Sequence, residues 1–145
     1  KFSMSINKTE STSWINWLED NKIGIYPLDR FSVRVNASWF PKEQHELRIK
    51  FQTTVMETET GVEWSADTAG NLNSTEKPVA GFDLGQVAFQ IRYKYEISPL
   101  SHFYAVYTRG GRHYEDDDVS VGKIISETWD NPKEDRFTLK LRIKF

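Results

Sequence analysis

The end of the chain alternates strictly between apolar and polar residues. Every odd position from 137 to 145 is apolar, and the even positions between them are Thr138, Lys140, Arg142 and Lys144. Successive side chains of a β-strand point to opposite faces. The stretch therefore predicts a strand with one apolar face and one strongly cationic face.

The same two-residue period recurs along most of the chain. It predicts strands at residues 2–6, 13–26, 31–39, 47–55, 87–97, 102–109 and from about 137 onward. Polar residues, with Pro, Asp or Ser in several places, predict turns at 27–30, 41–44 and 98–101, and allow one at 19–22. We see no period of 3.6 residues, so the pattern predicts an all-β protein without helices.

Two long polar segments, at about 57–81 and 110–136, interrupt the alternation and are predicted to be loops. Counted back from the last residue, the connections run long, short, long and short. Bacterial outer-membrane barrels alternate long extracellular loops with short periplasmic turns. With the chain end on the periplasmic side, both long loops would be extracellular. The order predicts an antiparallel up-and-down transmembrane β-barrel in the outer membrane of a Gram-negative bacterium.

Fewer strands are visible than the roughly eight of the smallest closed barrels. Residues 1–145 are therefore expected to be the C-terminal segment of a larger barrel, closed by upstream strands of the same precursor or by another chain. The chain also begins inside an alternating pattern and without an initiator Met, which fits a precursor with an upstream secretion signal.

Aromatic residues make up 14% of the chain and gather near predicted strand ends. Barrels carry such rings as girdles at the membrane interface, although aromatic residues also favour strands in general. The residues expected at the periplasmic end are Trp14, Trp17, Trp39, Phe40, Tyr93, Tyr95, Phe103, Tyr104 and Phe145.

Composition narrows the possible functions. The formal net charge of −2 gives no case for a nucleic-acid partner, and the absence of cysteine excludes disulfides and Cys-based metal sites. No apolar run approaches the about 20 residues of a membrane helix. The mean hydropathy of −0.61 would suit a soluble protein, but barrel strands give a weak hydropathy signal because half of their residues face a polar lumen.

Three motifs resemble a known family. They are Trp39-Phe40-Pro41 leading into 45–52, then 90–101, then 106–111. Together with the last strand they are similar to the C-terminal barrel region of a family of uncharacterised bacterial outer-membrane proteins. In that family a domain similar to family-nine carbohydrate-binding modules usually precedes the barrel. The resemblance implies the barrel fold, the outer membrane and its lipid, and a link to carbohydrate binding or uptake, but no specific activity.

The chain end also resembles the signal that the barrel-insertion machinery reads. Its apolar positions would be Leu141, Ile143 and the terminal aromatic Phe145. The insertion machinery is therefore an expected partner.

The polar positions of the predicted strands carry many basic residues. If the apolar positions face lipid, a set of cations would line the lumen and favour an anionic or carbohydrate solute. The alternative is that these charges pair across strands with Glu46 and Glu96. The candidates are Arg34, Arg48, Lys50, Arg92, Lys94, Lys140, Arg142 and Lys144.

No catalytic, cofactor or metal site is predicted. The acidic run at 115–118 has oxygen ligands suited to calcium but lacks the glycine spacing of known calcium loops. His45 and His102 have no second His or Cys at ligand spacing. Ser101-His102 lacks an orienting group, so an enzymatic activity stays undecided and disfavoured.

Two other classes of protein fit parts of this pattern. In a soluble β-sandwich or a lipocalin-like binder, the apolar positions would face an internal core. An outer-membrane enzyme would carry a surface hydrolase site, with a Ser, a His and an acid meeting at one rim. The leading hypothesis is a membrane barrel that acts as a porin-like conduit or a surface anchor.

Overall fold

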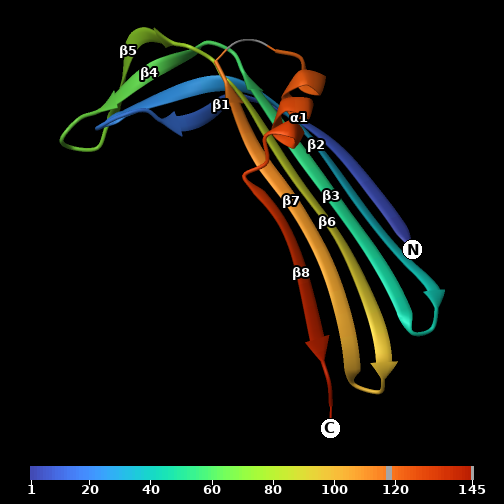
Figure 1. Ribbon diagram of the computed structural model, residues 1–145. Helices are drawn as coiled ribbons and strands as arrows, with labels where there is room; N and C mark the ends of the chain where they lie inside the picture. Colours follow the sequence, from blue (N-terminus) through green and yellow to red (C-terminus); the bar gives the residue numbers. More distant parts are fainter. Residues whose placement is uncertain (117–118, 145) are drawn as a thin grey trace.

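The computed structural model describes residues 1–116 and 119–144 and is mostly β (Figure 1). Eight antiparallel strands form one sheet in the order β5-β4-β2-β3-β6-β7-β8, and β1 pairs with the other edge of β2. A short helix, α1, lies between β7 and β8. The bounds are β1 Phe2–Trp17, β2 Lys22–Lys42, β3 His45–Thr58, β4 Gly61–Ala66, β5 Leu72–Val79, β6 Asp83–Ser98, β7 Ser101–Glu115, α1 Val121–Asp130 and β8 Glu134–Arg142. The prediction of an antiparallel β protein is confirmed.

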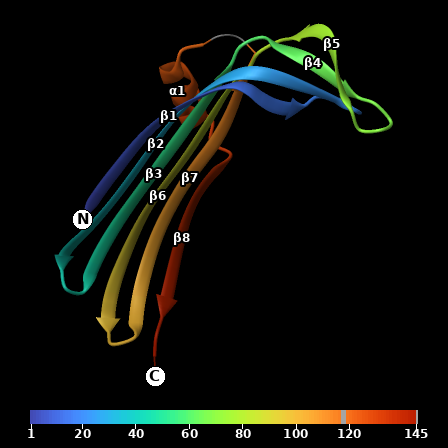
Figure 2. The ribbon, with the colours of Figure 1, turned by 180° about the vertical axis from the view of Figure 1, so that it is seen from behind.

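The sheet is open. Among the described residues, β1 pairs only with β2 and β8 only with β7, so both strands are free along one edge. The long strands run side by side as a twisted and curved blade, with β1 and β8 at opposite margins (Figure 2).

The two ends of the blade differ. The turns at 43–44 and 99–100, the start of β1 and the exit of β8 lie toward one end, which we call the short-turn end (Figure 1). The turn at 18–21, the β4–β5 hairpin and α1 lie at the other, the long-connection end. Apart from the short turn at 18–21, the connections at this end are the longer ones, and they contain the β4–β5 hairpin and α1.

Register explains why the sheet has two unlike faces. In an antiparallel pair, directly opposed residues point to the same side. One such row contains only apolar residues and crosses six strands, and its members are Phe2, Ala37, Ile49, Ile91, Tyr107 and Phe137. The face to which this row belongs is called the apolar face. The opposite one, which carries Lys50 and Gln90 as neighbours, is called the polar face.

The prediction that the chain has no helix is wrong. The side chains that form one face of α1 repeat at the helical spacing of i, i+3, i+4, i+7 and i+8, at positions 121, 124, 125, 128 and 129. Within a segment that otherwise looks like a polar loop, ten residues were too few to reveal it. Ile124 and Thr128 are buried against the apolar face, where Gly85 lies directly beneath them.

Arg109 of β7 holds the end of α1. Its Nε and Nη2 atoms donate hydrogen bonds to the carbonyl oxygen of Trp129 at 3.1 and 2.7 Å. Its guanidinium carbon lies 5.0 Å from the centre of the Trp129 ring, and Nη1 bonds Asp135 at 2.8 Å. A helix ends with unpaired carbonyl groups, and one of them is satisfied here by the sheet itself.

Other predicted boundaries are also corrected. The segment 57–81 is not a loop throughout, because it forms the β4–β5 hairpin, and β7 extends through residues 110–115. The turn predicted at 27–30 is absent, since β2 continues through it. Pro27 has no N–H to donate, and it lies where the β1–β2 register shifts between Ser11 and Trp14. A proline is tolerated at such an interruption.

The small hydrophobic core lies at the long-connection end, on the polar face. Tyr26, Phe82 and Leu84 are buried together, and Trp14 packs against them with its ring centre 5.8 Å from that of Phe82. Trp14 and Trp17 were expected among the periplasmic aromatics. That expectation is wrong, because the unbroken β1 carries both to the opposite end, beside the turn at 18–21.

Candidate functional site

The apolar face is largely uncovered. Phe137, Leu139 and Leu141 of β8 expose 65%, 58% and 59% of their surface. Among the described residues, α1 is the only element that packs over this face, and it covers the long-connection end alone. Other large apolar residues exposed on it are Phe2, Met4, Ile6 and Trp39.

The uncovered area is tallest on β2, because α1 covers the same rows of β6, lying over Gly85 and packing Trp129 on Phe89. On β2 it extends from Phe31 to Trp39, which at about 3.4 Å per residue spans about 27 Å along the strand. Tilted by about 40°, it would cover about 21 Å along the membrane normal, against an apolar band of about 25 Å in known barrels. A row of carboxylates and a set of aromatic residues bound the area at its two ends.

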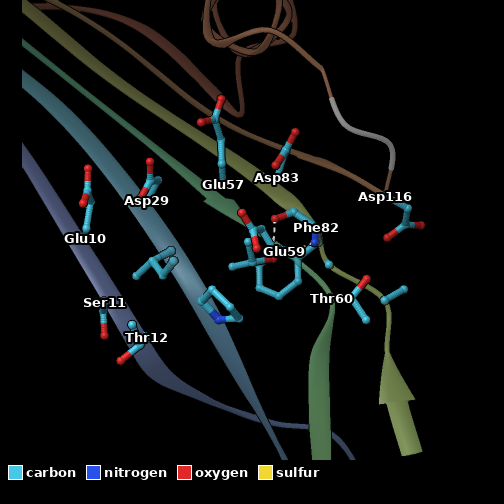
Figure 3. A pocket seen from close by; sticks show the side chains of 15 residues that line it. Glu10, Ser11, Thr12, Asp29, Glu57, Glu59, Thr60, Phe82, Asp83 and Asp116 are labelled. Atoms are coloured by element: carbon cyan, nitrogen blue, oxygen red, sulfur yellow. Dashed lines mark hydrogen bonds between the residues drawn. The ribbon is translucent and has the colours of Figure 1, made fainter.

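The carboxylates form what we call the acidic row. Glu10, Asp29, Glu57, Asp83 and Glu115 are direct neighbours on five adjacent strands and point to the apolar face. Figure 3 shows four of them beside a cavity of about 930 Å³ at the long-connection end. The sequence did not reveal this row, because the five residues come together only once the strand register is known.

Partners compensate part of the acidic row. Lys8 lies 2.6 Å from Glu10 and 3.2 Å from Asp29, measured between Nζ and the nearer carboxylate oxygen. Asp83 is buried, and its Oδ2 accepts a hydrogen bond from the backbone N–H of Val119 at 3.1 Å. Like charges placed directly opposite each other destabilise a sheet, so these contacts offset a repulsion that the register imposes.

Aromatic residues mark the other boundary, at the short-turn end. The imidazole of His45 stacks on Tyr95 with 4.8 Å between ring centres, and its Nδ1 lies 2.6 Å from the hydroxyl of Tyr93. Tyr95 is opposite Phe103, and Trp39 is 63% exposed. These aromatics are at the end where the sequence placed them.

The predicted basic residues of the strands share the polar face. Arg48 and Arg92 are directly opposite each other, and Glu46 bridges them, with Arg92 Nη2 3.6 Å from its carboxylate. Arg34 donates to Gln52 at 3.3 Å. The register also places Lys50, Lys94, Lys140 and Arg142 on this face.

Cross-strand pairing neutralises only part of this charge. Glu46 pairs with arginines as expected, but Glu96 faces His102 at 3.7 Å instead of a Lys or Arg. In the described part of the chain, Lys50, Lys94, Lys140 and Arg142 form no ion pair. The polar face is therefore net cationic.

The remaining candidates do not combine into a reactive site. The Ser101 hydroxyl accepts a hydrogen bond from the backbone of Lys144 at 3.1 Å, which gives this serine a structural role. Nδ1 of His102 is buried and unpaired among the described atoms. Lys144 lies two residues beyond the end of β8, and Ile143 and Leu141 are exposed. Phe145, the third position of the expected assembly signal, lies outside the described residues.

No helix in the described part of the chain has the length and apolar character needed to cross a membrane. No protein-family model, curated protein or solved structure matches the chain. The resemblance to a family of outer-membrane proteins therefore stays a prediction.

Proposed function

We propose that this chain forms part of the wall of an outer-membrane β-barrel that acts as a porin-like conduit. Its apolar face would contact lipid, and its cationic face would line a water-filled interior. One observation carries the proposal: a largely uncovered apolar face lies back to back with a polar, net cationic face on the same long strands.

The strand lengths support the same assignment. A strand needs about 9–11 residues to cross a bilayer at a tilt of about 45°. β2, β3, β6 and β7 have 14 to 21 residues, and β8 has nine. The extra length of the four longer strands would project beyond the bilayer at the long-connection end, above the acidic row.

The open margins are consistent with incorporation into a larger barrel. A free strand edge offers unpaired backbone groups to any other strand, and inside a bilayer each unsatisfied group costs several kcal/mol. We infer that further strands, from the same polypeptide or from another copy, pair with β1 and β8 and close the wall.

The charge of the interior suggests which solutes would pass. Rings of Lys and Arg favour anions in membrane pores. Four cations on the polar face have no carboxylate partner among the described residues, and Lys50 lines a cavity of about 530 Å³ together with Arg34 and Gln90. An anionic solute, such as an acidic sugar or a phosphate, fits this face better than a cation.

A soluble binder remains the second class to be tested. It would need a second layer over the apolar face, and the described residues supply only α1, at one end. Vesicle flotation separates the two classes. The membrane protein, diluted from urea into lipid vesicles, should float with them and leave the β1–β8 sheet protected from protease. A protein that stays monodisperse in the aqueous fraction would contradict the proposal.

The conduit itself is tested by ion selectivity. The folded protein in planar bilayers should pass anions in preference to cations, and the double substitution Lys50→Glu/Lys94→Glu should shift the reversal potential toward cation selectivity. Lys133→Glu, exposed between α1 and β8, is the matched control and should leave selectivity unchanged. Folded, vesicle-inserted protein without conductance would contradict the conduit and leave only a role as an anchor.

A further inference from the structure

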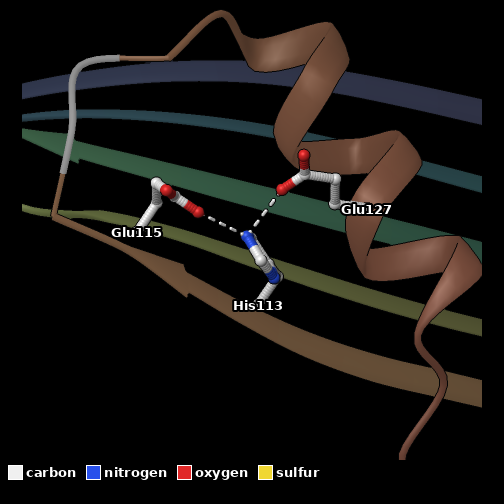
Figure 4. A group of neighbouring side chains, drawn as sticks. All are labelled: His113, Glu115 and Glu127. Atoms are coloured by element: carbon white, nitrogen blue, oxygen red, sulfur yellow. Dashed lines mark hydrogen bonds and ion pairs between the residues drawn. The ribbon is translucent and has the colours of Figure 1, made fainter.

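His113, Glu115 and Glu127 converge at the long-connection end (Figure 4). His113 and Glu115 lie on the same face of β7, and Glu127 comes from α1. Nε2 of His113 is 2.9 Å from an oxygen of Glu115 and 2.8 Å from an oxygen of Glu127. One ligand atom from each residue lies within 4.8 Å of the others, and all three side chains are partly buried.

A hydrogen bond alone does not account for this arrangement. An imidazole Nε2 carries at most one proton, so it cannot donate a full hydrogen bond to two carboxylate oxygens. The two carboxylates also repel each other, and Asp83, directly opposite Glu115, adds negative charge. Lys123 also lies near the cluster, with its Nζ 3.7 Å from an oxygen of Glu127, but its side chain is more than half exposed. A small cation bound by all three residues would satisfy the nitrogen and both oxygens.

We propose that His113, Glu115 and Glu127 bind one divalent transition-metal ion, of which Zn²⁺ is the representative, and that this ion fastens α1 to β7. Imidazole nitrogen and carboxylate oxygen are ordinary zinc ligands, whereas calcium takes oxygen ligands almost alone. Metal–ligand bonds of about 2.1 Å at a tetrahedral angle separate ligand atoms by about 3.4 Å. The distances from Nε2 of His113 to the two carboxylate oxygens, 2.9 and 2.8 Å, are somewhat shorter than this value. A modest movement of the side chains would therefore complete the site. Three protein ligands leave the fourth position to water.

The position of the site gives it a structural consequence. α1 is held at its C-terminal end by Arg109, which binds the carbonyl of Trp129, and Glu127, two residues earlier, reaches His113 of β7. A metal ion there would add a second attachment between helix and sheet. This inference does not depend on whether the apolar face contacts lipid, because α1 already covers that face at the cluster.

The test uses the untagged full chain and Zn²⁺ itself as the probe. Calorimetry should show one Zn²⁺ per chain, with no comparable binding of Ca²⁺ or Mg²⁺. Glu127→Gln and His113→Gln should each weaken binding by at least about tenfold, since loss of even an outer-shell partner typically costs about 10–100-fold. Glu96→Gln is the matched control, because Glu96 faces His102 in a pair that lacks a third ligand, and it should leave affinity unchanged.

Two readouts on the unmodified protein apply even if the substitutions impair folding. X-ray absorption of the zinc-loaded protein should show one imidazole among oxygen neighbours. Hydrogen exchange of the α1 amides should slow when Zn²⁺ is added. The absence of saturable binding, equal affinity in Glu127→Gln and the unmodified protein, or a zinc shell without imidazole would each overturn the proposal.

Discussion

At the scale of the residue, Gly85 shows how closely α1 approaches the sheet. A Cβ atom at this position would overlap Ile124 Cγ2 and Thr128 Oγ1, both of which belong to buried side chains. The helix can rest directly on β6 only because the strand has no side chain there.

We predict that Gly85→Ala displaces α1. Overpacking of this kind costs about 1–3 kcal/mol, and here it should appear as faster protease cleavage of the segment 119–133 rather than as loss of the sheet. The control is Gly122→Ala, where a Cβ meets nothing within 4 Å and a helix should gain about 0.5–1 kcal/mol. Equal cleavage of the two variants would contradict the docked position of α1.

Asp67 gives a prediction for how the stability of the turn at residues 67–71 depends on pH. The side chain of Asn71 donates to its carboxylate at 3.0 Å, and the backbone N–H groups of Asn71 and Ala69 donate at 2.8 and 2.9 Å. These bonds hold the pKa of Asp67 below its ordinary value. The stabilisation of the turn is therefore fully present above the unfolded pKa of about 3.9 and is lost as the pH falls through the lower, folded value.

NMR checks this expectation through the amide protons of Ala69 and Asn71. Their shifts should stay constant at neutral pH and titrate only in acid, below about pH 3.9. In Asp67→Asn this titration should disappear. A midpoint at or above the ordinary value of an aspartate would count against the turn as described.

At the scale of the element, alternation in the sequence identified most strands but not their ends. Residues 87–97 and 102–109 lie inside β6 and β7, and the turn at 98–101 is where it was expected. A period of two cannot distinguish a turn from a strand that crosses a register shift, which is why β2 was divided at Pro27. The helix and the β4–β5 hairpin were missed because short elements among polar residues carry little periodic signal.

Some features of the site could likewise not be predicted from the sequence. The alternation already placed the basic residues on the face opposite the apolar one, because the even or odd position of a residue in its strand decides the face to which it points. The acidic row and the His113–Glu115–Glu127 cluster depend on register between strands and on where α1 docks. Neither is encoded in local spacing, because Glu115 and Glu127 are separated by the entire connection into the helix.

An arginine substitution in the middle of the apolar face tests its environment. Ile91 belongs to the all-apolar row, and Gln90 is its neighbour on the polar face. If the face contacts lipid, Ile91→Arg should cost about 2–4 kcal/mol near the membrane midplane, whereas Gln90→Arg should cost less than about 1. Urea unfolding of the vesicle-inserted protein measures both. Similar costs for the two variants would argue that lipid does not contact Ile91.

At the scale of the whole molecule, the sheet combines a largely uncovered apolar face, a net cationic face and two unlike ends. In the barrel that we propose, the short-turn end would be periplasmic and the long-connection end extracellular. The open margins at β1 and β8 leave strand edges that the proposed barrel would pair with further strands.

The most direct test of this account measures what the two faces of β8 contact. Spin labels at Leu139 and Leu141 in the bilayer-inserted protein should be relaxed by oxygen, which concentrates in lipid. Labels at Lys140 and Arg142 should respond to a water-soluble nickel chelate instead. This alternation is the result that the account predicts. The reversed pattern, or equal access of the chelate to all four positions, would contradict a lipid-facing apolar surface.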